Sequence, residues 1–416
     1  MTRQMKLGAF LWATGHHIAA WRHPKAHVTA GIDVDHYIRL ARTAEAAKFD
    51  MVFCEDAAGL REANVGIASQ TSRSIGFEPI SLLSALAVQT SRIGLVSTAS
   101  TSYNEPYGLA RIFLSLDRLS GGRAGWNLVT SASPIEAANF GATGLKPHAD
   151  RYERAREFAE VVRGLWQGGS FPGHDGQSFS VRDPLDLPRS PQGAPVMVQA
   201  GASDVGRDLA ARTADVVFTA AQTLEEAKAF YDDLKGRMAA YGREPDDIKI
   251  MPGVSPVVAK TEAEAREKQE ELQALIPDDV GVALLSSYLS ISDLHRHPID
   301  GPMPELPETE GMKSRQALVV EQSRRDGLSI RQLARHFAGA RGHWRIVGTP
   351  AQIADELQAR FEGGGADGFN VMPSYFPGEL DAFCDLVVPE LQRRGLFRRE
   401  YEGSTLREHL GLKRPA

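Results

Sequence analysis

The amino-acid sequence predicts an α/β protein built on a (β/α)8 barrel, in which parallel strands alternate with helices. Three observations favour this fold class. Short apolar segments alternate with amphipathic ones along most of the 416 residues. Segments such as FDMVFCED at 49–56 are almost continuously apolar, as expected of a parallel strand that is buried on both faces. With 42% hydrophobic residues, the chain can also fill a core of this size. A doubly wound open sheet is the alternative.

Hydrophobic periodicity and the residue types typical of helix ends locate each predicted element along the chain. The predicted strands cover 6–11, 49–56, 92–100, 123–131, 194–201, 214–220, 247–259 and 368–373. The predicted helices cover 33–48, 79–90, 106–118, 150–166, 203–213, 224–241, a long segment that opens at Thr261, 350–362 and 379–394. Pro79 suits a first helical turn, and Asp150 with Glu153 has the spacing of a capping box.

The chain is longer than a bare barrel, which takes roughly 250 residues. We predict a single barrel domain over residues 1–416, with insertions at about 132–148, 167–193 and 270–345. The last insertion contains the run HRHPIDGPMPELPETEG, which is rich in proline and too irregular for a core element. Long insertions in barrels commonly cover the active site, so residues 270–345 are predicted to form a lid.

Composition narrows the classes of function. The chain has 47 Lys and Arg residues against 53 Asp and Glu residues, and no basic run indicates a nucleic-acid partner. No apolar run approaches the length of a membrane span, and MTRQMKLGAFLW lacks the features of a signal peptide. The two cysteines, Cys54 and Cys384, are far apart in the sequence. We therefore expect a cytoplasmic protein with reduced thiols that binds neither nucleic acid nor a membrane.

The carboxyl ends of the strands are where a barrel places its active site. Hydroxyl and amide side chains dominate these positions, and clusters of His, Asp and Glu are scarce. The polar positions are TGHHIAAWRHP after the first strand, Glu55 and Asp56, Thr98 to Asn104, Asn127 with Thr130 and Ser131, Gly201 to Ser203, and Ser374 with Tyr375. No metal site is predicted from this pattern.

Two short stretches have features of an anion site. GASDVG at 201–206 is a strand-to-helix turn, where Ser203 offers a hydroxyl and a backbone N–H at a helix start. A simple N-cap role accounts for Ser203 equally well. HADRY at 148–152 places His148 just before a helix and Tyr152 in its first turn, from which both side chains can reach an anion. Helix capping and ordinary packing of Tyr152 are the alternative explanation.

Taken together, these stretches resemble one family. The matching segments, in order, are LGAFLWATGHHIAAWRHP, FDMVFCED, EPISLLSALAVQTSRIGLVSTASTSYNEPYGLAR, SLDRLSGGRAGWNLVTS, RYERAREF, QAGASDVGR and GTPAQIADELQARFEGGGADGFNVMP. The chain resembles the two-component FMN-dependent monooxygenases of the bacterial-luciferase-like superfamily. Within it, the resemblance is to the branch that holds nitrilotriacetate monooxygenase component A, pristinamycin synthase and dibenzothiophene-sulfone monooxygenase. The region from about 270 to 340 matches least.

The resemblance implies a luciferase-like barrel that binds reduced FMN (FMNH2) supplied by a separate NAD(P)H:flavin reductase. With O2 as co-substrate, such an enzyme oxygenates a small organic substrate through a C4a-(hydro)peroxyflavin. A homodimer or homotetramer is expected. The cofactor residues carried over are Asp56 in the flavin pocket, Thr98 and Asn127 at the ring or ribityl chain, and His148, Tyr152, Ala202 and Ser203 at the phosphate.

Other functions stay open at this point. A deazaflavin-dependent oxidoreductase of the same superfamily differs only in the cofactor that it binds. A non-catalytic protein would bind flavin without oxygenating a substrate. A metal-dependent barrel hydrolase would need an H-x-H motif after the first strand, where this chain has adjacent histidines.

The loop TGHHIAAWRHP, residues 14–24, has three interpretations. A metal site would combine its histidines, but no carboxylate or cysteine pattern completes one. A structural loop would simply pack Trp21. We favour a substrate-pocket loop, in which Trp12 walls the pocket and His17 contacts the substrate or acts as acid or base near neutral pH. His17 is then expected to affect turnover and not FMN binding.

The substrate is not fixed by the resemblance, because that branch oxidises amine chelators, sulfur heterocycles, alkanes and cyclic imines. We expect the 14–27 loop, the 57–78 loop and the lid to select it. Arg61 and Arg73, in the 57–78 loop, hint at an anionic substrate.

Overall fold

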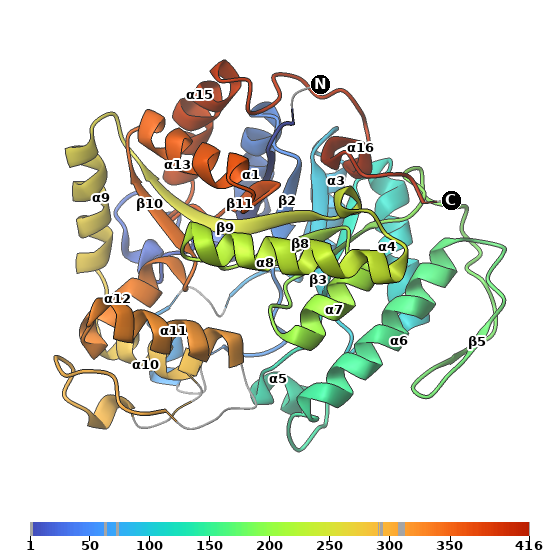
Figure 1. Cartoon of the computed structure of the whole chain (residues 1–416), viewed down its shortest axis with the longest axis horizontal. Coiled ribbons are helices and arrows are strands. Elements are labelled where there is room, and N and C mark those ends of the chain that lie inside the picture. Colours follow the sequence, from blue (N-terminus) through green and yellow to red (C-terminus); the bar gives the residue numbers. More distant parts are fainter. Residues whose placement is uncertain are drawn as a thin grey trace.

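The barrel predicted from the sequence is present and closed. The computed structural model describes residues 3–61, 65–71, 75–289, 291, 294–306 and 313–415. Its barrel strands are β1 (Lys6–Leu11), β2 (Met51–Cys54), β3 (Gly94–Ser100), β4 (Ala124–Val129), β7 (Val196–Gln199), β8 (Val216–Thr219), β9 (Lys249–Val258) and β11 (Gly368–Val371). All are parallel, and pairing of β9 with both β8 and β11 closes the ring (Figure 1). The open-sheet alternative is therefore wrong.

The helices surround the barrel as the βα alternation predicts (Figure 1). The main ones are α1 (Val34–Ala46), α3 (Pro79–Ala87), α4 (Pro106–Ser120), α6 (His148–Trp166), α7 (Asp204–Thr213), α8 (Leu224–Arg237), α9 (Glu262–Ala274), α13 (Pro350–Glu362), α14 (Gly378–Ala382) and α15 (Val388–Arg393). Shorter ones are α2 (Val65–Ala68), α16 (Leu406–Leu410), η1 (Ala20–Arg22), η2 (Ala30–Ile32), η3 (Met238–Tyr241) and η4 (Pro245–Asp247). Helix α9 begins after Thr261, whose hydroxyl accepts from the backbone of Glu264 in a capping box.

Two helices differ from their predicted form. Helix α6 begins at His148 rather than at residue 150, and Pro147 occupies the capping position without a side-chain hydrogen bond. The predicted capping box of Asp150 and Glu153 is therefore wrong, because Pro147 already supplies the extended residue before the helix. The predicted helix 379–394 contains the π-helical turn η6 (Phe383–Val387) ahead of Pro389, whose missing N–H disfavours a regular α-turn there.

The insertions contain more regular structure than their composition suggests. The first holds α5 (Pro134–Asn139), and the second holds a hairpin of β5 (His174–Asp175) and β6 (Ser180–Val181). The third holds α10 (Asp278–Leu289), η5 (Leu294–Arg296), α11 (Lys313–Asp326), α12 (Ile330–Ala340) and the start of β10 (Trp344–Gly348). Figure 1 shows α10, α11 and α12 grouped on one side of the barrel. Strand β10 was not predicted; it pairs with Val254–Val258, the half of the long β9 that extends past the ring.

The interior of the barrel is apolar at the end where the strands begin. Leu406 and Leu410 of α16 are fully buried there, in a cluster with Met51, Val96 and Val196. A Cβ on Gly94 would lie 2.4 Å from the Cδ1 atom of Leu406, so the start of β3 accepts the helix only because it lacks a side chain. Helix α16 thus fills this end of the barrel.

Both cysteines are buried and free: Cys54 lies on β2 and Cys384 on η6. Within the residues that the structure describes, no helix combines the length and apolar character that a membrane crossing requires.

Candidate active site

A cavity of about 1360 Å³ lies at the carboxyl ends of the strands. It is larger than the roughly 300–1,000 Å³ of common ligand pockets, so a cofactor and a second molecule fit together. Phe10, Phe53 and Phe218, from three different strands, form part of its wall, and the ring centroids of Phe10 and Phe53 lie 4.7 Å apart. Residues of the third insertion also line it, among them Val282 of α10 and His295 of η5.

The structure gathers the seven predicted cofactor residues in the lining of this one cavity. They are Asp56, Thr98, Asn127, His148, Tyr152, Ala202 and Ser203. They come from four successive positions of the ring, since they follow or lie on β2, β3, β4 and β7. Their contacts with a flavin stay predictions.

Two helices begin at one end of the cavity. His148 is the first residue of α6, and Ser203 is the N-cap of α7, where its Oγ accepts a hydrogen bond from Gly206 N at 3.2 Å. The backbone before α7 lies close to the helix, because a Cβ on Gly201 would meet the Cα of Gly206 at 3.1 Å and the hydroxyl of Tyr152 at 3.4 Å. The first-turn N–H groups of both helices favour an anion at this end.

Arg151 at this end was missed by the sequence analysis. It lines the cavity, the residue is 5% exposed, and its Nη1 donates to the carbonyl of Lys146 at 2.5 Å. Its buried Nε has no hydrogen-bond partner among the described residues. Such a cation is expensive to bury without an anion. The available signal was its i+3 spacing from His148, which puts the two side chains on one helix face.

Asn127 and Thr98 form a buried polar pair on adjacent strands. They are direct neighbours in the β3–β4 register, and Asn127 Nδ2 donates to Thr98 Oγ1 at 2.8 Å. Asn127 Oδ1 is buried without a partner among the described residues, so it can accept a hydrogen bond from a ligand. Thr101 and Ser102 instead donate to the backbone carbonyls of Val129 and Thr130 at the end of β4, so Thr98 is the hydroxyl of this stretch that lines the cavity.

Asp56 has an unusual electrostatic environment. Burial raises its pKa to about 6, and the nearby carboxyl groups of Glu78 and Glu136 raise it as well, against the opposing effect of Arg61. Burial also raises the pKa of Glu136, which lines the same cavity. Both carboxyl groups therefore hold a proton at higher pH than usual.

We expect the pKa shift of Asp56 to be visible in the stability of the protein. From about pH 4 to about pH 6 the folded state keeps a proton on Asp56 that the unfolded state has lost, so the contribution of Asp56 to the free energy of unfolding falls as the pH rises through this range. An Asp56→Asn variant lacks this decline, so its stability relative to the wild type should rise between these pH values. Denaturant unfolding at several pH values measures the difference; a difference that is constant with pH would contradict the shift.

The TGHHIAAWRHP loop supports the cavity wall rather than lining it. The backbone N–H of His17 donates to Ser374 O, and Ile18 N donates to Ala338 O of α12. Burial lowers the pKa of His17 to about 3, so its ring is uncharged near neutral pH. Neither His17 nor Trp12 is a lining residue, which gives no support to acid–base chemistry by His17; its effect on turnover stays a prediction. Within the described residues, no group of His, Cys, Asp and Glu is placed to hold a metal ion.

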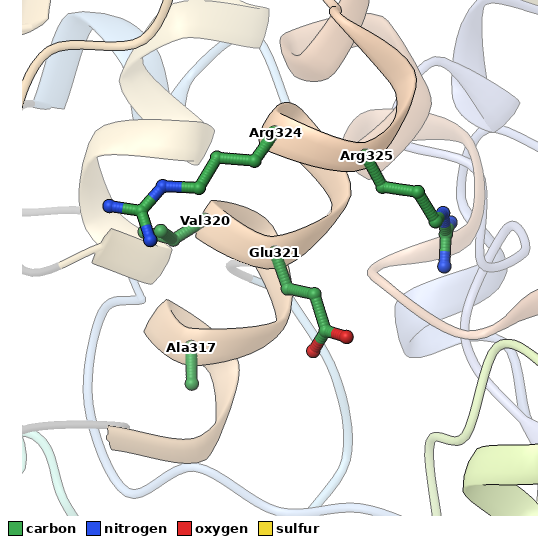
Figure 2. Close-up of a pocket in the computed structure, with 5 residues that line it drawn as sticks. All are labelled: Ala317, Val320, Glu321, Arg324 and Arg325. Atoms are coloured by element: carbon green, nitrogen blue, oxygen red, sulfur yellow. The ribbon is translucent and has the colours of Figure 1, made fainter.

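A second hollow lies along α11 (Figure 2). Its five lining residues are Ala317, Val320, Glu321, Arg324 and Arg325. The charged side chains point in different directions in Figure 2 and do not converge on one point. The strand-end cavity, where polar groups converge, is therefore the candidate active site.

The luciferase-like monooxygenase family profile matches residues 9–368 of this chain. The chain belongs to that family. Nitrilotriacetate monooxygenase component A from Aminobacter aminovorans is 48% identical over 99% of this chain and 97% of its own length. The N-acetyl-S-(2-succino)cysteine monooxygenase of Bacillus subtilis (strain 168) is 47% identical over 99% of this chain and 98% of its own. This luciferase-like protein is accordingly a monooxygenase.

A solved structure of riboflavin lyase (RcaE) with modified FMN and riboflavin also resembles this luciferase-like barrel. The TM-score is 0.88 at 30% identity, over 99% of this chain and 97% of the other.

Proposed function

We propose that this luciferase-like monooxygenase uses reduced FMN, delivered by a separate NAD(P)H:flavin reductase, and O2 to oxygenate a small organic substrate. The observation that carries the proposal is the convergence of Asn127 Oδ1 and Arg151 Nε, two buried polar atoms without described partners, on one large cavity. Binding of FMN would satisfy both. The name of the Aminobacter relative, component A, supports the existence of a further component that supplies the flavin.

The residues present fit FMN in an extended pose. The doubly charged phosphate suits the cavity end where α6 and α7 begin, with Arg151, His148, Tyr152 and Ser203 around it. The ring system suits the polar pair of Thr98 and Asn127, in which Asn127 Oδ1 offers a buried acceptor. Asp56 would lie close to the ring and hold a proton there near pH 6.

Reduced FMN, when bound, supplies the electrons that activate O2 for transfer of one oxygen atom. The chain's part is to orient the cofactor and the substrate and to exclude water from the reaction. Residues of α10 and η5 line the cavity on the side of the third insertion, which supports the proposal that residues 270–345 act as its lid. The oxygenating species that the family resemblance implies stays a prediction, as do the domain and oligomer assignments.

An anaerobic titration tests the proposal directly. We expect the purified protein to bind reduced FMN more tightly than oxidised FMN. Mixing the complex with oxygenated buffer should then give a slow return of the absorbance of oxidised flavin, slower than for free reduced FMN, because the cavity shields the cofactor. Preferential binding of a deazaflavin would favour the oxidoreductase alternative. If neither flavin form binds, the proposed function is wrong.

A further inference from the structure

Three charged residues meet on one wall of the cavity. Glu55 follows β2, Arg61 lies in the loop beyond it, and Arg341 lies in the turn between α12 and β10. Arg61 Nη1 donates to Glu55 Oε1 at 2.7 Å, and Arg341 Nη2 donates to Glu55 Oε2 at 3.0 Å. All three residues line the cavity. One carboxylate is thus shared by two guanidinium groups, which we call the arginine pair (Arg61 and Arg341).

The side chain of Trp12 orients the arginine pair. The guanidinium carbon of Arg61 lies 4.6 Å from the centroid of the indole ring, and that of Arg341 lies 4.4 Å from it. Both arginine side chains are 15% exposed. Stacking on an aromatic face and a shared carboxylate hold the two planar groups in place before any ligand arrives. Trp12 therefore acts on the cavity through the arginine pair.

The carboxylate between the two arginines stays ionised. Burial alone would raise the pKa of Glu55, but the guanidinium groups of Arg341 and Arg61 outweigh burial and hold that pKa well below its usual range. Glu55 therefore contributes one negative charge against the two positive charges of the arginine pair.

Arg61 has N–H donors beyond the one that it uses within the described part of the chain. A guanidinium group carries five N–H bonds, and in the part of the chain that the structure describes the side chain of Arg61 donates one hydrogen bond, to Glu55. The remaining donors belong to a residue that lines the cavity. Planar donors of this kind match the two oxygens of a carboxylate.

Three of the four other acidic residues that line the cavity oppose the positive charge of the arginine pair less than ordinary carboxylates would. Asp278 is engaged by Arg331 and Arg335. Asp56 and Glu136 have raised pKa values, so each takes up a proton more readily than an ordinary carboxyl group when an anion enters. The fourth acidic residue, Asp279, lies in the first turn of α10, where it accepts a hydrogen bond from Gln70 Nε2 at 3.5 Å.

We propose that the substrate carries a carboxylate group and that Arg61, held by Glu55 and Trp12, binds it. The inference rests on the proposed function and adds the substrate class to it. The carboxylate subsite follows β2, whereas the phosphate end follows β4 and β7, so the two anions occupy different parts of the ring. The substrates named for the two relatives above each carry several carboxylate groups, which makes them suitable probes.

Binding of N-acetyl-S-(2-succino)cysteine to the protein loaded with oxidised FMN, measured by calorimetry, tests the subsite. We expect the wild type to bind this tricarboxylate and to discriminate against its uncharged triamide. Arg61→Gln should weaken tricarboxylate binding by about 10- to 50-fold, because it removes charge-assisted hydrogen bonds. Arg61→Lys should lose less, since it keeps the charge without the planar fork.

Two controls make the outcome specific. Arg111→Gln, an exposed arginine on α4, should leave tricarboxylate binding unchanged. Arg61→Gln should bind reduced FMN as tightly as the wild type, which also shows that it is folded. Equal affinity of the wild type for tricarboxylate and triamide, or of Arg61→Gln and the wild type for the tricarboxylate, overturns the inference. Failure of the wild type to bind reduced FMN is a separate result and overturns the proposed function instead.

Discussion

Replacing Arg151 by methionine is expected to weaken the binding of reduced FMN by about 100-fold, which corresponds to two lost charge-assisted hydrogen bonds. The buried Nε of Arg151 has no partner among the described residues, and the side chain lies where α6 begins, beside the cavity. A phosphate would complete that environment. Methionine keeps an unbranched apolar stem of similar size to that of arginine, so the main change is the loss of the guanidinium charge and its donors.

The same substitution should leave the flavin-free protein as stable as the wild type, or more stable. Methionine removes a buried cation whose Nε has no partner among the described residues, and the Lys146 carbonyl that loses its partner belongs to an exposed residue. Anaerobic titration with reduced FMN and denaturant unfolding measure the two effects. Arg156→Met is the matched control, because Arg156 lies on the outer face of the same helix and pairs with Glu153. Equal flavin affinity of Arg151→Met and the wild type would remove Arg151 from the phosphate site.

Replacing Gly15 by alanine is expected to lower the free energy of unfolding by about 3 kcal/mol or more. Gly15 has a φ of +131°, a conformation that L side chains rarely adopt. A Cβ there would lie 2.4 Å from both the carbonyl oxygen of Ser374 and the Cα of Tyr375, which are backbone atoms that cannot turn away. The clash would separate two segments that are joined by backbone hydrogen bonds from His16 N to Pro373 O and from Phe376 N to Thr14 O.

Guanidinium chloride unfolding of the Gly15→Ala variant checks this expectation. Gly144→Ala is the control, since Gly144 is exposed, has no positive φ and would place its Cβ in open space. If both substitutions cost the same, the close approach at Gly15 is not a source of stability.

The barrel was predictable because its signal is local. Each strand is a short apolar run between helices with recognisable ends, and the eight runs predicted are the eight strands of the ring. The third insertion lacks this repeated pattern of apolar runs between helices. Its prolines suggested irregular structure, so its helices were not predicted. Helix α12 nevertheless begins with a capping box of Ser329 and Gln332, a signal that the sequence contains. Strand β10 was missed because it pairs outside the ring, with the second half of β9.

In the candidate site, too, residues with a local sequence signal were predicted, and contacts between distant residues were not. Residues at strand ends, such as Asn127 and Ser203, were found because a barrel gathers strand ends at one edge. The contact between Glu55 and Arg341 joins residues 286 positions apart, and no local pattern indicates it. His17 was predicted to affect turnover because of its unusual sequence context, and that stays a prediction; in the fold its loop is bonded through the backbone to Ser374 and Ala338. Arg73, the other arginine that hinted at an anionic substrate, lies outside the described residues.

The closure of the ring has a consequence for how the chain matures in the cell. One edge of β1 pairs with β2, and the other edge pairs with β11, with Lys6 opposite Gly368. The cluster below the cavity likewise includes Leu406 and Leu410 from near the end of the chain. Ribosomal synthesis proceeds from the N-terminus. The edge of β1 that pairs with β11 therefore stays unpaired until more than three hundred and fifty further residues have been made. During that interval an exposed strand edge can pair with another nascent chain. Efficient production should therefore depend on chaperone capacity more than on the final stability of the protein.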